Sequence, residues 1–109
     1  FRRKSMIILH NKLVRDNIPD LIKSNGQSAK TVILDDEKYT AALEKKLKEE
    51  TREYLCSKEI MELADILEVV EALAKNQGSS FDEVLQLKKQ KQEENGAFDK
   101  KIFLVSVKK

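Results

Sequence analysis

Four acidic residues in the middle of the chain have the types and the spacing that a metal site needs: Glu50, Glu53, Glu62 and Asp65. Each successive pair is spaced i, i+3, so its two members share one face of a helix. If two helices fold back on each other about Ser57–Lys58, Glu53 comes level with Glu62 and Glu50 with Asp65. The sequence therefore predicts that four carboxylates gather in one small volume.

Four neighbouring anions repel one another, and partial burial adds a desolvation cost. Either some of the carboxyl groups stay protonated, or a multivalent cation neutralises them. Oxygen ligands without nearby Cys or His suit a hard ion such as Mg²⁺, with Mn²⁺ as a second choice, rather than Zn²⁺. The only histidine, His10, lies far away in the sequence and is interpreted as a surface or loop residue.

A simpler interpretation also exists, because acids at the margin of a helical stripe commonly pair with lysines one turn away. Glu49 could pair with Lys45 or Lys46, and Glu53 with Lys46 or Lys58. This interpretation usually suffices for a single acid. Four acids matched across a hairpin favour the metal site.

Basic residues occur where they could reach a phosphate beside such an ion. An apolar stripe that begins within 81–85 becomes cationic at Lys88 and Lys91. Lys12 and Arg15 precede the first predicted helix. Cations in these places could contact a polyphosphate. Alternatively, the late helix is simply solvated in its second half, and the early pair makes ion pairs that anchor its segment.

Start and stop signals predict four helices that would position these groups. A short helix begins at or after Asn17, carries Pro19 in its first turn and ends at Gly26. A long helix follows over about 38–56, with an N-cap and acidic first turn supplied by Asp35 and Asp36.

The third helix is predicted over about 59–76, with Ser57 as its cap. Ser80 and Glu83 form a capping-box pattern for a fourth helix that ends near Asn95. We expect an all-α protein, a compact helical bundle built around a central antiparallel hairpin.

Two short peripheral strands are considered beside these helices. Residues 30–34 are rich in β-branched side chains, and residues 101–107 could form a strand or an extended arm.

The third helix has an unusually wide apolar arc. One predicted buried face comprises Ile60, Leu63, Leu67, Val70 and Ala74. Three further apolar residues widen the arc beyond half of the circumference, namely Ile66, Val69 and Leu73. These three need a covering surface that one small chain does not obviously supply, so we expect self-association.

Length and composition favour one soluble domain over residues 1–109. Charged residues reach 37% and aromatic residues are few, which suits helices with long solvated faces. A net charge of +2 is too small to imply a stable nucleic-acid complex. A single cysteine, Cys56, excludes an internal disulfide, and the absence of a long apolar run or signal peptide favours a cytoplasmic protein without membrane contact. Met6 could be the natural start, in which case residues 1–5 are additional to the domain.

The motifs "KEETREYL" and "MELADILEVVEAL" resemble the MazG-like, all-α nucleoside triphosphate pyrophosphohydrolase family. The opening "KLVRDNIP" and the closing "KQEENGAFDKKIFL" are similar to its phosphoribosyl-ATP pyrophosphohydrolase-like subgroup. The resemblance thus covers the chain from Lys12 to Leu104. It implies a helical dimer or tetramer that uses Mg²⁺ to hydrolyse nucleotides between the α- and β-phosphates, giving a monophosphate and pyrophosphate.

The resemblance also implies roles for individual residues. The metal ligands would be Glu50, Glu53, Glu62 and Asp65. Glu49, beside Glu50, would bind the metal through water or position the attacking water. Phosphate contacts would come from Lys12, Arg15 and Lys91, and Lys88 joins them from the cationic stripe.

Two departures from the family pattern concern activity and substrate choice. Only eight residues separate Glu53 from Glu62, and Asn95 stands where many relatives carry Arg. A phosphoribosyl-ATP hydrolase is one alternative function. A helical oligomerisation or adaptor module without turnover is another.

Overall fold

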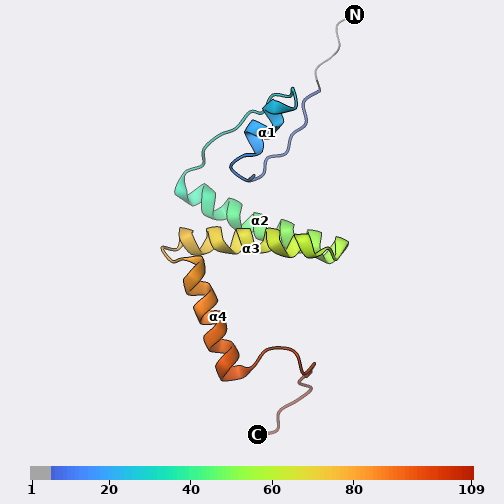
Figure 1. Ribbon diagram of the computed structural model, residues 1–109, viewed down its shortest axis with the longest axis vertical. Coiled ribbons are helices and arrows are strands. Elements are labelled where there is room, and N and C mark those ends of the chain that lie inside the picture. The colour runs from blue at the N-terminus through green and yellow to red at the C-terminus, as the bar shows by residue number, and fades with distance from the viewer. Residues whose placement is uncertain (1–5) are drawn as a thin grey trace, which may run out of the picture.

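The computed structural model describes residues 6–109, and the interpretation of residues 1–5 lies outside that range. Figure 1 shows four helices joined by short or irregular segments. They are α1 (Ile18–Ser24), α2 (Asp36–Ser57), α3 (Ile60–Asn76) and α4 (Phe81–Asn95). The predicted all-α class is confirmed.

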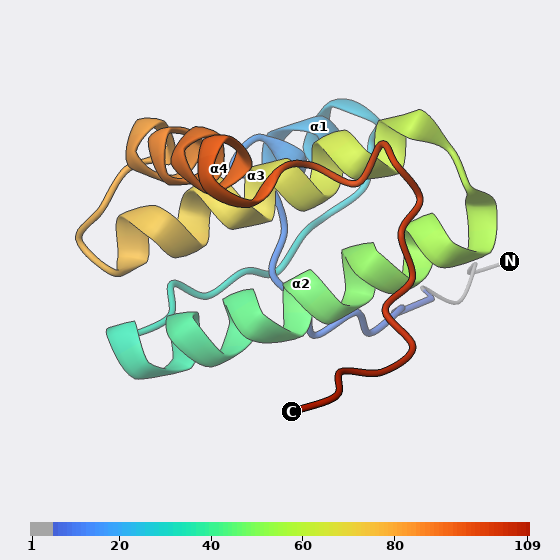
Figure 2. The same cartoon turned by 90° about the horizontal axis from the view of Figure 1, so that it is seen from below.

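The centre of the molecule is the antiparallel hairpin of α2 and α3, as predicted. The two helices lie side by side along their length (Figure 2). Their interface buries Leu43 of α2 and both Val69 and Ala74 of α3. Burying these side chains removes apolar surface from water and stabilises the hairpin.

The ends of α2 explain its length. Asp35 is the N-cap, and its side chain accepts a hydrogen bond from the backbone N–H of Lys38 at 2.8 Å, as the sequence predicts. At the other end Lys58 adopts a left-handed conformation, with φ of 60°, and its N–H donates to the carbonyl of Tyr54. This conformation stops the helix and turns the chain back.

The prediction that Ser57 is the N-cap of the third helix is wrong. Ser57 is the last residue of α2, and Glu59 is the N-cap of α3 without a side-chain cap. The Ser57 hydroxyl oxygen instead accepts a hydrogen bond from the N–H of Glu59 at 3.2 Å. The serine therefore stabilises the turn between the helices rather than the first turn of α3.

The wide apolar arc of α3 is oriented differently from the prediction. Of the predicted buried face, Ala74 is buried and Val70 half-buried as expected, whereas Ile60, Leu63 and Leu67 are exposed. The three residues expected to need a second chain are covered within this one instead: Val69 is buried, and Ile66 and Leu73 are half-buried. When an apolar arc covers most of the helix circumference, helical periodicity alone does not show which side of it will be buried. The contact with α2 determines that side.

Both outer helices are joined to the open end of this hairpin, where the start of α2 lies beside the end of α3, and they leave it in opposite directions (Figure 1). Helix α1 begins after Asn17, with Pro19 in its first turn, as predicted. Helix α4 starts at the N-cap Ser80, whose hydroxyl accepts from the N–H of Glu83 at 3.1 Å. The Glu83 carboxylate bonds the hydroxyl of Ser79 rather than completing the capping box. From there α4 runs away from the hairpin (Figure 1).

Neither of the two peripheral strands forms within the described residues. Residues 30–34 and 101–107 are irregular and almost entirely exposed. A strand needs a neighbour to bond its backbone groups, and these two segments do not pair. The β-branched composition was therefore not sufficient, while the alternative of an extended C-terminal arm is what the chain adopts.

Candidate metal centre

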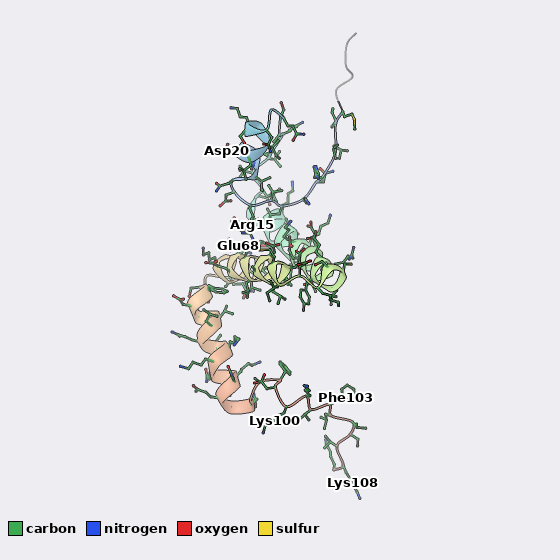
Figure 3. The ribbon with its side chains drawn as sticks, turned by 45° about the vertical axis from the view of Figure 1, so that its right-hand side comes forward. Arg15, Asp20, Glu68, Lys100, Phe103 and Lys108 are labelled. Carbon is green, nitrogen blue, oxygen red and sulfur yellow. The ribbon has the colours of Figure 1, made fainter. Side chains whose placement is uncertain are left out.

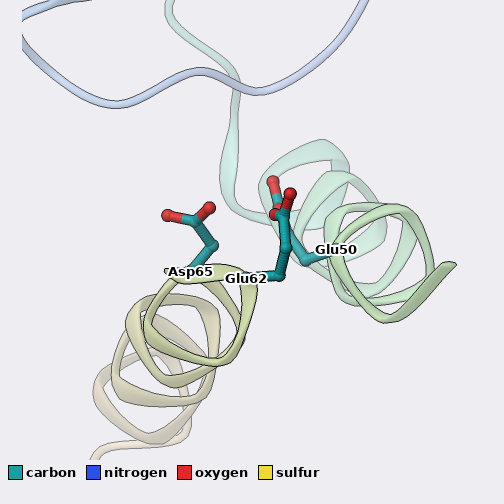
Figure 4. Close-up of side chains that lie close together, drawn as sticks. All are labelled: Glu50, Glu62 and Asp65. Atoms are coloured by element: carbon teal, nitrogen blue, oxygen red, sulfur yellow. The ribbon is translucent and has the colours of Figure 1, made fainter. Parts of the chain in front are cut away.

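Three of the four predicted metal ligands converge where α2 passes α3. Each of Glu50, Glu62 and Asp65 offers a carboxylate oxygen, and these oxygens lie within 4.8 Å of one another. Figure 4 shows all three side chains projecting on the same side of the hairpin, towards the N-terminal segment. Two helices that meet at a tight turn thus bring together acids that are up to 15 positions apart, from Glu50 to Asp65.

Glu50 is the most unusual member of the cluster. Its residue surface is only 8% exposed, and it is the one charged residue buried among those described. Its Oε2 atom is buried and has no hydrogen-bond partner. An unpaired carboxylate oxygen in such surroundings costs free energy, because desolvation is not repaid by a hydrogen bond. The oxygen is therefore placed to accept a ligand.

Lys46 also belongs to the site, although the sequence analysis did not select it as a functional residue. Its ammonium lies 3.3 Å from Glu50 Oε1 and 3.3 Å from Glu49 Oε2. The signal that could have found it is its spacing, since it precedes these two acids by one helical turn. The simpler pairing interpretation is thus correct for Glu49 and Lys46. It leaves the second oxygen of Glu50 unexplained.

The N-terminal segment crosses the acidic cluster and adds two cations. Lys12 Nζ lies 3.4 Å from Glu49 Oε1. Arg15 is 2.8 Å from Asp65 Oδ1 and 3.9 Å from Glu68 Oε1. Figure 3 shows Arg15 and Glu68 close together where this segment meets α3. The anchoring role considered for Lys12 and Arg15 is therefore present in the structure.

These groups surround a pocket of about 290 Å³ between the N-terminal segment and the hairpin. Its polar lining includes Lys12, Arg15, Lys46, Glu49, Glu50, Glu53 and Asp65. Apolar atoms of Val14 and Ile18 form the rest of the lining. A pocket lined by both carboxylates and cations suits a metal ion together with an anionic ligand.

Two carboxyl groups respond to this environment in opposite directions. The pKa of Glu62 is raised, first by desolvation and then by the negative charges of Glu53, Asp65 and Glu50. Desolvation also acts on Glu49, but hydrogen bonds and charge from Lys46 and Lys12 outweigh it, so the pKa of Glu49 is lowered. Repulsion is thus concentrated on the side of the cluster that lacks a lysine.

The remaining predicted residues lie further from the cluster. Glu53 lines the pocket and acts on Glu62 through its charge, but it is exposed and lies outside the close group of three. Lys88 and Lys91 are exposed on α4, which leaves the hairpin at its other end (Figure 1). A phosphate-binding role for these two lysines stays a prediction.

The fold and the site together define an all-α protein that has, beside its central hairpin, a pocket lined by acidic and basic side chains. Comparison with family models, with curated proteins and with solved structures finds no match to this chain. Within residues 6–109, none of the helices has the length and apolar character needed to cross a membrane.

Proposed function

We propose that this protein is an Mg²⁺-dependent nucleotide pyrophosphohydrolase, a member of the MazG-like family, that cleaves nucleoside triphosphates between the α- and β-phosphates. The products would be a nucleoside monophosphate and pyrophosphate. The observation that carries the proposal is the buried, unpartnered Oε2 of Glu50 beside Glu62 and Asp65. The resemblance of the acidic motifs to that family supplies the reaction.

The donor set fits a hard divalent ion. Glu50, Glu62 and Asp65 would hold it, with Glu53 as a further ligand from the pocket wall. All are carboxylates, which Mg²⁺ and Mn²⁺ accept, and neither cysteine nor histidine is among the residues that line the pocket. When bound, such an ion would neutralise phosphate charge and favour ionisation of the attacking water.

The cations at the rim would bind the phosphate chain. Lys12 and Arg15 already reach the edge of the acidic cluster, and both are partly exposed. A phosphate offers oxygens that satisfy a guanidinium in the same planar geometry as a carboxylate. Exchange of the Asp65 contact for a phosphate contact would therefore keep Arg15 paired while it positions the substrate.

Glu49 is suited to act on water rather than on the ion directly. Its lowered pKa keeps it ionised at neutral pH, so it can accept a hydrogen bond from a water molecule at the cluster. Fixing the attacking water and the phosphate together removes much of the entropic barrier of the reaction. Glu49 and Glu50 are the residues that we assign to catalysis.

The wider proposal is a cytoplasmic enzyme whose partner is a nucleotide and whose working form is a homodimer or homotetramer. Phosphoribosyl-ATP, the alternative substrate, shares the same phosphoanhydride chemistry. The pocket supplies no aromatic side chain that would select one base.

Release of pyrophosphate from a panel of nucleotides, with and without Mg²⁺, tests the proposal. The panel should include canonical and modified triphosphates and phosphoribosyl-ATP. We expect Mg²⁺-dependent release that Glu50→Gln abolishes and Glu44→Gln retains, because Glu44 is an exposed acid on the same helix. No release from any member, with no Mg²⁺-induced rise in Tm, would overturn the proposal and leave an adaptor module as the better account.

A further inference from the structure

The carboxylate oxygens of the cluster divide into those that already have a cation and those that have none. Glu49 has a lysine at each oxygen, since Lys12 Nζ lies 3.4 Å from Oε1 and Lys46 Nζ lies 3.3 Å from Oε2. Glu50 has Lys46 at Oε1, at 3.3 Å, whereas its buried Oε2 has no hydrogen-bond partner. Glu50 therefore keeps one oxygen for an ion, while lysines occupy both oxygens of Glu49.

The other available carboxylates lie where α3 faces Glu50. Asp65 pairs with Arg15 through Oδ1 alone, and Glu62 has no ion pair within residues 6–109. Glu50, Glu62 and Asp65 each offer one oxygen, and these oxygens lie within 4.8 Å of one another (Figure 4). Oxygens that share one Mg²⁺ at about 2.1 Å lie up to about 4.2 Å apart, so a small closure of this group surrounds a single ion.

Glu53 does not create a second ion site by itself. It is exposed and lies outside the close group of three. A single exposed carboxylate binds a hydrated Mg²⁺ only weakly unless a phosphate assists it. In the protein without a nucleotide, a second ion would therefore have to use the acids of α2 that adjoin the group.

Lys46 is held beside those acids by the helix that carries them. It lies one turn before them on α2, so the i, i+3 and i, i+4 spacings keep its ammonium at Glu49 and Glu50. Its side chain is only 16% exposed. Lys12 and Arg15, by contrast, come from the N-terminal segment, and their side chains are 41% and 54% exposed. These two can turn towards a phosphate, whereas Lys46 stays with the acids when an ion binds.

A second ion would need the oxygens that Lys46 already contacts. Sites with two catalytic metals hold them about 3.5–4 Å apart. An ion bound at that distance to Glu49 and to Oε1 of Glu50 would lie within a few ångström of the ammonium. Two cations so close repel each other strongly where water is largely excluded. Lys46 therefore supplies one positive charge where a second ion would otherwise bind.

We propose that Lys46 occupies the second cation position of this site, so that the protein's own side chains hold one divalent ion per chain. This inference rests on the proposed function, since it defines how many ions that function takes from the protein. Lys46 is a positioning residue, because its ammonium holds Glu49 and one oxygen of Glu50 and leaves the other oxygen of Glu50 for the ion. Glu49 then takes no part in metal binding and is left to act on water.

The number of Mn²⁺ ions bound by the full-length chain without a nucleotide tests the inference. Equilibrium dialysis counts the ions, and electron paramagnetic resonance shows whether they lie close together. We expect one ion on the unaltered chain, with the spectrum of an isolated Mn²⁺. Lys46→Met frees an oxygen on each of two acids, so we expect a second ion and the broadened spectrum of a coupled pair. Lys45→Met, which removes an exposed lysine, is the matched control and should bind one ion.

Two further variants locate the second ion and guard against a fold that fails. Lys46→Gln keeps hydrogen-bond donors for the acids but not the charge, so it should also bind two ions if Lys46→Met does not fold. Adding Glu49→Gln to either variant removes one of the two acids and should return the count to one.

The possible outcomes separate this inference from the proposed function. Two ions on the unaltered chain, or one isolated ion on both Lys46→Met and Lys46→Gln, would overturn the inference and leave a metal-dependent enzyme in place. A second ion that persists after Glu49→Gln would also overturn it, because that ion would bind elsewhere. No bound Mn²⁺ on the unaltered chain would overturn both the inference and the proposed function.

Discussion

Helices α2 and α4 both carry a stripe in which charged residues interrupt apolar ones, yet the two stripes meet different surroundings. In α2 the interrupting residue, Glu50, is 8% exposed because α3 packs over it. In α4 the interrupting residues, Lys88 and Lys91, are exposed because no part of the described chain packs there. The same sequence pattern therefore gives a buried carboxylate in one helix and a solvated face in the other. The neighbouring helix, rather than the stripe itself, determines whether the charged group is buried.

Removal of one carboxylate charge from the buried stripe should have the largest effect. We expect Glu50→Gln to lower Mg²⁺-dependent pyrophosphate release at least about 100-fold, because a neutral amide replaces the carboxylate at the centre of the cluster. Steady-state kinetics would measure this, with Glu44→Gln as the control on the same helix. Retention of near-normal activity would mean that the buried stripe is no more functional than the exposed one.

Lys46→Met should have the next largest effect, and on stability rather than on activity. The lysine lies 3.3 Å from both Glu49 and Glu50, and the side chains of Lys46 and Glu50 are largely buried. In EDTA we expect a loss of about 2 kcal/mol in the free energy of unfolding, because the carboxylates lose their only neutralising neighbour on α2. Urea denaturation would measure it.

Addition of Mg²⁺ should return most of that stability and should raise the Tm of Lys46→Met more than that of the unaltered chain. Lys45→Met, which removes an exposed lysine one position earlier, is the control. If Mg²⁺ raised the Tm of Lys46→Met no more than that of Lys45→Met, the result would contradict the view that Lys46 neutralises the acidic cluster in the absence of metal.

A smaller effect is expected at the rim of the pocket. Arg15→Gln should change the free energy of unfolding by no more than about 1 kcal/mol, because its ion pairs with Asp65 and Glu68 are partly exposed. If the guanidinium binds phosphate, the same substitution should raise KM for the nucleotide about tenfold. Arg52→Gln, an exposed change on α2, should alter neither quantity. A loss of stability without a change in KM would assign Arg15 to anchoring alone.

The smallest effect should be a pH dependence of stability without metal. The pKa of Glu62 is raised, so the folded state holds its proton more tightly than the unfolded state, and this stabilisation is lost as the pH rises above the ordinary glutamate range. The pKa of Glu49 is lowered, so its contribution has the opposite sign and is lost as the pH falls. Glu62→Gln should therefore raise the Tm in EDTA at pH 7 and have less effect at pH 4.

Thermal unfolding of Glu62→Gln and Glu44→Gln at the two pH values separates this from a general loss of charge. An equal change at both pH values would show that repulsion within the cluster does not reach Glu62. In that case the buried and the exposed stripes would differ in packing but not in electrostatics.

The sequence predicted the helices well, because their signals are local. Asp35 and Ser80 cap the helices that they were expected to cap, and Gly96, with φ of 85°, follows the last residue of α4. Predictions that depended on contact with another segment were less accurate. Residues 30–34 do not pair with another strand, and contact with α2 determines which side of the wide apolar arc of α3 is buried.

The candidate site shows the same difference between local features, which the sequence predicted, and features that depend on contact between segments. The two i, i+3 pairs and the short turn predicted that four carboxylates would meet. Glu50, Glu62 and Asp65 do, whereas Glu53 is exposed and lies outside this group. Lys46 was missed as a site residue because its spacing suggested only an ordinary surface pair. Its burial between two acids depends on the whole pocket.

By itself the sequence determined where helices begin and end and which acids share a helical face, since capping and periodicity act over a few residues. Only the tertiary structure decided that one oxygen of Glu50 would be buried without a partner and that Lys12 and Arg15 would lie against the acids. It also decided that Leu63 and Leu67 of α3 would be exposed. The physical reason is that desolvation and ion pairing depend on what surrounds a group in space, and the neighbours concerned are 37 and 50 positions apart in the chain.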